Sequence, residues 1–146
     1  MNDPFSILLC LPDGIELFDP DPEQTERRDV EIVDEWRDDT RGVVGWSDGG
    51  GRALDAAAAH PELERLVLVS LPFPDDGPTE RIETITAKTL LLFGSADPRT
   101  GSSHGTRWQK ALPNARLEMC PGLDHDVLVP MWKRVVSFLA PRRKAS

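Results

Sequence analysis

Three polar residues of this chain, Ser47, Asp97 and His125, each come shortly after a short apolar segment. A hydroxyl, an imidazole and a carboxylate in hydrogen-bonded series can attack a carbonyl carbon, because the imidazole takes the hydroxyl proton while the carboxylate orients the ring. Each residue alone has an ordinary explanation as a turn or loop residue. The chemistry therefore depends on the elements that would bring the three side chains together.

Ser47 has the most specific surroundings. It is the centre of a G-x-S-x-G pattern, residues 45–49, between an apolar segment at 42–46 and an Ala-rich segment at 48–60. Between a strand and a helix this pattern is typical of a nucleophile elbow, a sharp and strained turn that leaves room only for small neighbours. The backbone amide of Asp48 would then point at the site where an oxyanion forms, at the start of a helix.

The order of elements from residue 42 onward predicts how these residues are held. Apolar strands and helices alternate, as expected for right-handed crossovers in a parallel sheet with helices on both faces. We predict strands at 42–46, 66–69, 89–93 and 115–120, helices at 48–60, 106–112 and 126–139, and a loop at 71–80. Ser47, Asp97 and His125 would all follow the carboxyl ends of strands, where α/β sheets carry their sites.

The first forty residues show a different pattern. Apolar segments at 6–11 and 15–18 flank a Pro-Asp-Gly turn at 12–14, which predicts an N-terminal β-hairpin. Apolar residues at three-residue steps predict a helix over 25–39, with Thr25 as its N-cap.

Length, charge and composition limit the possible classes of protein. With 146 residues, we expect a single domain over 1–140 and a basic disordered tail at 141–146. A net charge of −8 argues against nucleic-acid binding, and no apolar run could span a membrane. Without a visible signal peptide, we expect a cytoplasmic protein with Cys10 and Cys120 as free thiols.

The motifs together resemble the α/β-hydrolase superfamily. Residues 45–50 (GWSDGG) are similar to the elbow of its valacyclovir-hydrolase-like and small esterase branches. Residues 92–98 (LFGSADP) look like its acid strand, and 121–125 (PGLDH) look like its histidine loop. The resemblance covers about 29–140. It implies a shortened α/β-hydrolase-type, mostly parallel sheet with helices on both faces, here with the predicted N-terminal hairpin.

The chain order Ser47, Asp97, His125 is that of the superfamily's triad. By this resemblance the protein would be a serine hydrolase that cleaves a small ester or thioester through an acyl-enzyme, with neither metal nor cofactor. Only residues 71–88 fill the interval where related proteins often insert a cap, so we expect an open site. We predict Trp46, Leu71 and Phe73 as its substrate-binding residues.

The second oxyanion donor is harder to find, because the His-Gly loop that supplies it in the superfamily is missing from the first half of the chain. Two alignments are possible. In one, 7–11 is the strand before that loop and Leu11 supplies the amide. In the other, 11–17 is the opening hairpin of the superfamily and the next strand–helix–strand unit is missing. The Pro-Asp-Gly turn favours the second.

Two further expectations follow from a shortened sheet. An incomplete oxyanion hole leaves open an α/β-hydrolase-fold protein with lost or repurposed activity, such as a binding or accessory module, or a cyclase or lyase. Missing strands beside the elbow strand would expose backbone donors and acceptors, which predicts a homodimer through that sheet edge.

Overall fold

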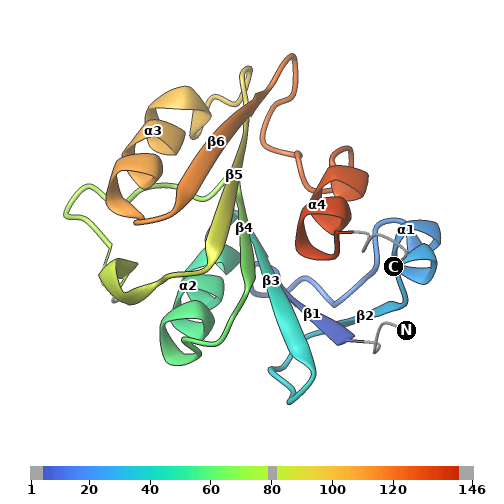
Figure 1. The fold of residues 1–146 in the computed structure, drawn as a ribbon. Helices are drawn as coiled ribbons and strands as arrows, with labels where there is room; N and C mark the ends of the chain where they lie inside the picture. Colours follow the sequence, from blue (N-terminus) through green and yellow to red (C-terminus); the bar gives the residue numbers. More distant parts are fainter. Residues whose placement is uncertain (1–4, 79–81, 142–146) are drawn as a thin grey trace.

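The computed structural model describes residues 5–78 and 82–141, and most of the predicted tail lies outside them. One parallel sheet, ordered β2-β1-β3-β4-β5-β6, forms its centre (Figure 1). The strands are β1 (Phe5–Cys10), β2 (Val30–Val33), β3 (Thr40–Trp46), β4 (Arg65–Val69), β5 (Lys88–Gly94) and β6 (Ala115–Cys120). The helices are α1 (Pro22–Arg27), α2 (Gly50–Ala59), α3 (Gly101–Ala111) and α4 (Trp132–Leu139), with short 3-10 turns η1 (Ser47–Gly49) and η2 (Ile82–Thr84).

Both faces of the sheet are covered. Figure 1 shows α2 and α3 on one side and α1 and α4 on the other. Because side chains alternate along a strand, the central strands contribute to two apolar layers. Val43 and Leu91 pack in the layer with Trp108 of α3, whereas Val44 and Leu90 pack in the layer with Val135 of α4. The predicted α/β class, with helices on both faces, is confirmed.

From residue 40 onward the predicted strands are all present, and the corrections concern helix ends. The last helix begins at Trp132 instead of residue 126, because 126–127 are irregular and 128–131 form turns, and Pro130 therefore precedes it. The helix predicted at 106–112 begins earlier, at Gly101, which has a left-handed φ of 63°, and it ends at Ala111.

The predicted N-terminal hairpin is wrong. The Pro-Asp-Gly turn forms, since the Ile15 amide donates to the Pro12 carbonyl at 3.2 Å, but the residues after it leave the sheet. Phe18 is 39% exposed. The physical reason is that β1 is already paired in parallel with β2 on one side and β3 on the other, so no edge remains for a hairpin partner.

The predicted helix over 25–39 is also wrong. A short helix, α1, begins after Asp21, which caps it by accepting from the Glu23 amide, and Thr25 lies inside it. Asp29 has a φ of 56°, a left-handed conformation that ends the helical path. The β-branched residues that follow then form β2, where apolar spacing had suggested a helix.

These corrections decide between the two alignments. β1 lies directly beside β3, the strand that leads into Ser47, so the alignment with Leu11 after the neighbouring strand is the one the structure supports. The strand–helix–strand unit is present, and the edge strands are β2 and β6. The expected dimer thus loses the bare edge on which it was based, and it stays a prediction.

In residues 5–78 and 82–141, no helix has both the length and the apolar composition that crossing a bilayer requires.

Candidate active site

The turn after β3 places Ser47 at the carboxyl edge of the sheet. Ser47 has a φ of 52°, in the left-handed region, and it is 3% exposed. A Cβ at Gly45 would lie 2.6 Å from the Gly50 Cα, so the strand and the following helix approach too closely for any side chain there. The strained serine between glycines is the predicted elbow geometry.

The same turn packs against the end of β1. A Cβ at Gly49 would lie 2.3 Å from the Cys10 carbonyl oxygen and 2.7 Å from the Leu11 carbonyl carbon. The backbone of Leu11 is therefore a direct neighbour of the elbow, and Arg52 of α2 also donates to the Leu11 carbonyl. Both residues predicted as oxyanion donors, Asp48 and Leu11, belong to this junction.

The three chemically competent side chains meet at this edge. The Ser47 Oγ lies 2.7 Å from His125 Nε2, and His125 Nδ1 lies 2.8 Å from Asp97 Oδ2. A neutral imidazole protonated on Nδ1 satisfies both contacts, because it then donates to the carboxylate and accepts from the hydroxyl. Residues that are 78 and 28 positions apart in the chain thus form one hydrogen-bonded series.

Asp97 is held as an anion by its surroundings. Its side chain is fully buried, and desolvation alone would raise its pKa. Hydrogen bonds outweigh that effect: Thr100 Oγ1 donates at 2.5 Å, His125 Nδ1 at 2.8 Å and the Arg99 amide at 2.8 Å. The pKa of Asp97 is therefore lower than its ordinary value. An ionised carboxylate can stabilise an imidazolium beside it.

Thr100 provides a test of this electrostatic balance. Thr100→Val removes one donor, so the Asp97 pKa should rise and the variant should be less stable at pH 7 by about 1 kcal/mol. Because the pKa of Asp97 is lower in the folded protein than in the unfolded chain, its ionisation stabilises the fold at pH values above the unfolded-state pKa of about 3.9. That stability is lost as the pH falls through the folded-state pKa. Urea unfolding at pH 7 and near pH 3 should show that the difference in unfolding free energy between the wild-type protein and Thr100→Val is smaller at the lower pH. A difference independent of pH would contradict this role.

The loop with His125 docks on the end of β5. The Ala96 amide donates to the Leu123 carbonyl at 2.9 Å. A Cβ at Gly94 would lie 2.2 Å from the carbonyl oxygens of both Leu123 and Asp124. Gly94, the last residue of β5, is therefore needed for the approach that brings His125 to Asp97. This need was not evident from the sequence.

Gly94→Ala should separate these two segments. Because the added methyl group meets backbone atoms, which cannot rotate away, we expect a stability loss of about 1–3 kcal/mol. We also expect lower activity, since the imidazole is displaced. Thermal unfolding and turnover at a temperature where the variant is folded measure the two effects. Wild-type behaviour in both would show that the close approach is not required.

Trp46, predicted as a substrate-binding residue, contacts the histidine loop. Its indole N–H donates to the His125 carbonyl at 3.1 Å, and its ring lies 5.9 Å from the imidazole ring. These contacts fix the backbone and ring of His125 from the side of the elbow strand.

The other two predicted substrate-binding residues lie in the loop after β4. Leu71 is 6% exposed and belongs to the apolar layer beside α2, against Gly50. Phe73 is half-buried, with its ring packed edge-on at 4.7 Å against Trp108 and its amide donating to His104 Nδ1. Both side chains are therefore in contact with other parts of the fold.

Arg99 is a site residue that sequence reasoning missed. Its Nη1 donates to Ser47 Oγ at 3.2 Å, and its Nη2 pairs with Asp48 Oδ1 at 2.8 Å, with the Arg99 side chain 49% exposed. Its backbone amide meanwhile holds Asp97. One residue therefore contacts the hydroxyl, the acidic neighbour and the buried carboxylate, and it brings a positive charge beside Ser47.

In the part of the chain that the structure describes, no group of three or more histidine, cysteine, aspartate or glutamate side chains could hold a metal ion. Both cysteines are buried and unpaired.

Comparison with solved structures gives similar chains of one fold. The predicted CIB-like hydrolase from Thermoplasma acidophilum matches with a TM-score of 0.71 and 17% identity, over 94% of this chain and 87% of that one. Est1E from Butyrivibrio proteoclasticus matches with a TM-score of 0.67 and 16% identity, over 91% and 85%. The α/β-hydrolase enzyme MGS-MChE2, from a lagoon-sediment metagenome, matches at 0.68 and 13%, over 88% and 85%.

The sheet order, the elbow and these likenesses define the class: the protein has the α/β-hydrolase fold. Neither protein-family models nor curated protein sequences give a match to the chain. The structural likeness, at identities below 20%, therefore concerns the fold.

Proposed function

We propose that the protein is a serine hydrolase that cleaves a small ester or thioester through an acyl-enzyme. The observation that carries this proposal is the continuous series from Ser47 Oγ through His125 to the buried carboxylate of Asp97, with contacts of 2.7 and 2.8 Å. The hydrolase names of the structural neighbours support the same reaction class.

The geometry suits the first half of the reaction. Ser47 Oγ forms a bond to the carbonyl carbon while its proton passes to His125 Nε2, and the carbonyl π electrons move to the oxygen. When the tetrahedral intermediate collapses, the carbon–oxygen or carbon–sulfur bond to the leaving group breaks. The leaving alcohol or thiol takes the proton from Nε2. Asp97 stabilises the transient imidazolium without taking its proton.

The second half repeats these steps with water. Water attacks the acyl-enzyme and gives its proton to His125 Nε2, and the Ser47 Oγ recovers that proton as the acid leaves. The second-step nucleophile needs an open approach to the acyl carbon, which an uncapped site would allow.

Three groups are proposed to stabilise the oxyanion. The backbone amide of Asp48 follows the nucleophile, and that of Leu11 lies at the neighbouring strand end that packs on the elbow. Arg99 adds a guanidinium 3.2 Å from Ser47 Oγ. Because the Ser47 Oγ bonds to the carbonyl carbon, a cation beside it also lies near the carbonyl oxygen, on which the negative charge develops.

Turnover of p-nitrophenyl acyl esters tests the proposal. We expect the wild-type protein to release p-nitrophenol and to prefer short acyl chains, since the described residues between β4 and β5 form only loop and the short turn η2. Acetate, butyrate and decanoate esters should be compared at pH 7.5. Failure of all three esters and of their thioester analogues to turn over above the buffer rate would favour a repurposed α/β-hydrolase-fold protein.

A further inference from the structure

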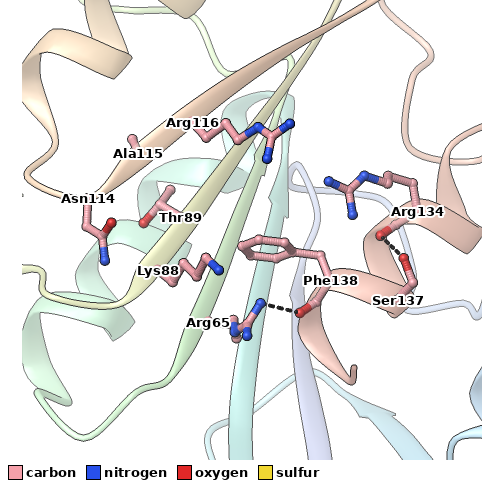
Figure 2. Close-up of a pocket in the computed structure, with 9 residues that line it drawn as sticks. All are labelled: Arg65, Lys88, Thr89, Asn114, Ala115, Arg116, Arg134, Ser137 and Phe138. Carbon is pink, nitrogen blue, oxygen red and sulfur yellow. Dashed lines mark hydrogen bonds between the residues drawn. The ribbon is translucent and has the colours of Figure 1, made fainter. Parts of the chain in front are cut away.

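A basic hollow of about 300 Å³ lies on the side of the sheet covered by α4, at the amino ends of β4, β5 and β6. Figure 2 shows side chains from these strands and from α4 around it. They include Arg65, Lys88, Asn114, Arg116, Arg134 and Phe138. We call these six residues and the space between them the basic hollow.

Strand register explains why the cations gather there. Arg65 and Lys88, the first residues of β4 and β5, are directly paired, and Arg116 of β6 is paired with Leu90. Leu90 belongs to the apolar layer under α4, and Lys88 and Arg116 share its face of the sheet by alternation. Three adjacent strands thus carry positive charges on the α4 side of the sheet, next to Phe138.

The charges of the basic hollow are only partly neutralised. Glu118 accepts a two-point contact from Arg134 and lies 3.9 Å from Arg116. Arg65 donates to the Phe138 carbonyl at 3.3 Å and lies over the Phe138 ring. Among the described residues, no ion pair is recorded for Lys88. Four cations therefore face one paired carboxylate, in a protein whose net charge is −8.

The Arg116 side chain is 78% exposed and Lys88 is also exposed, so an anion from solution can reach both charges. Like charges on directly paired strand positions repel each other. Arginine forks bind phosphate through two parallel hydrogen bonds, and a lysine ammonium adds a point charge. Figure 2 shows the guanidinium groups of Arg116 and Arg134 directed toward each other, above the Phe138 ring. A dianion in the basic hollow would offset two of the three unpaired positive charges, whereas a monoanion would offset one.

We propose that the basic hollow binds the phosphate group of a small phosphomonoester, with Lys88, Arg116 and Arg134 as the anion ligands and the organic part along Phe138. The volume of about 300 Å³ lies at the lower end of small-molecule sites, which suits a ligand of this size.

This site is separate from the candidate active site. Arg65 begins β4 and Val69 ends it, level with Trp46, the residue before Ser47. At about 3.3 Å for each strand residue, the two sites lie on the order of 15 Å apart, at opposite ends of the strands. A ligand in the basic hollow therefore does not compete with a substrate at Ser47, and the proposal holds whether or not the protein is a hydrolase.

Calorimetric titration with phenyl phosphate at low salt tests the proposal. We expect one site per chain, no binding of phenol, and at least tenfold weaker binding of the monoanion benzoate. Inorganic phosphate binding as tightly as phenyl phosphate would show that the site takes free phosphate and would overturn the phosphomonoester assignment. No heat and no thermal stabilisation with 10 mM phenyl phosphate would overturn the proposal as a whole.

Matched variants distinguish specific binding in the basic hollow from non-specific electrostatic attraction to surface cations. Lys88→Gln and Arg116→Gln should each weaken binding about tenfold, as expected for the loss of a charged hydrogen bond. Lys110→Gln, an equal charge change on the exposed face of α3, should change affinity less than twofold, and Ser47→Ala should leave it unchanged. Equal weakening by Lys88→Gln and Lys110→Gln would overturn the proposal, and circular dichroism confirms that each variant is folded.

Discussion

Ser47→Ala is expected to lower kcat for p-nitrophenyl acetate by about 10⁴-fold or more, to the rate given by binding and oxyanion contacts alone. The reason is that the bond to the carbonyl carbon forms at the Ser47 Oγ, which contacts His125 Nε2 at 2.7 Å. Removing this oxygen leaves the imidazole with no positioned nucleophile. Substrate binding should change little, so the loss should appear in kcat.

Ser103→Ala is the matched control, because it removes the same hydroxyl group from an exposed position on α3. It should keep wild-type kcat. Steady-state kinetics with circular dichroism on all three proteins measures the effect. Turnover by Ser47→Ala within tenfold of wild type would show that another group carries the reaction.

Asp97→Asn is expected to lower kcat by about 10⁴-fold as well, with the fold preserved. The carboxylate accepts from His125, Thr100 and the Arg99 amide. An asparagine amide presents an N–H group in place of one acceptor oxygen. If it faces His125, the imidazole is left with its proton on Nε2, where it cannot accept the Ser47 proton. The buried charge that stabilises the imidazolium is lost at the same time.

Asp126→Asn is the control for this change, because Asp126 is exposed and adjacent to His125 in the chain. Asp126→Asn removes a negative charge near the imidazole and leaves the contact between Asp97 and His125 in place. We expect it to keep kcat within a few-fold of wild type. Equal losses in the two variants would indicate a general electrostatic effect of negative charge around His125 and would contradict a specific role for Asp97.

The second half of the chain was predictable because its signals are local. A parallel strand covered on both faces must be apolar, and the residues after each strand are polar and glycine-rich. The convergence of Ser47, Asp97 and His125 follows from that order, because carboxyl ends of parallel strands meet at one edge. Position in the chain was thus enough to predict that these three residues meet.

The first half was not predictable by the same means. The Pro-Asp-Gly turn forms as expected, but a turn does not determine which strand pairs with β1. Pairing with β3 is set by burial on both faces, which depends on residues about 35 positions away. The β-branched residues of β2 are spaced as in a helix, and the left-handed Asp29 that precedes them decides the outcome.

Arg99 shows a further limit of sequence reasoning. Its backbone position beside Asp97 is local, but its contact with Ser47 joins the ends of two non-adjacent strands. A long side chain can reach several partners from that position, and spacing alone does not select one. The Arg99 contacts therefore emerge only from the structure.

Covalent labelling by a fluorophosphonate tests the central claim most directly, because this reagent needs an activated serine and no particular acyl substrate. Intact mass and peptide mapping should show one adduct per chain, on Ser47, with labelling at least about 100-fold slower in His125→Ala, which lacks the general base. Absence of an adduct on wild-type protein, or an adduct on Ser47 that forms equally fast without His125, would contradict the proposed hydrogen-bonded series as a catalytic unit.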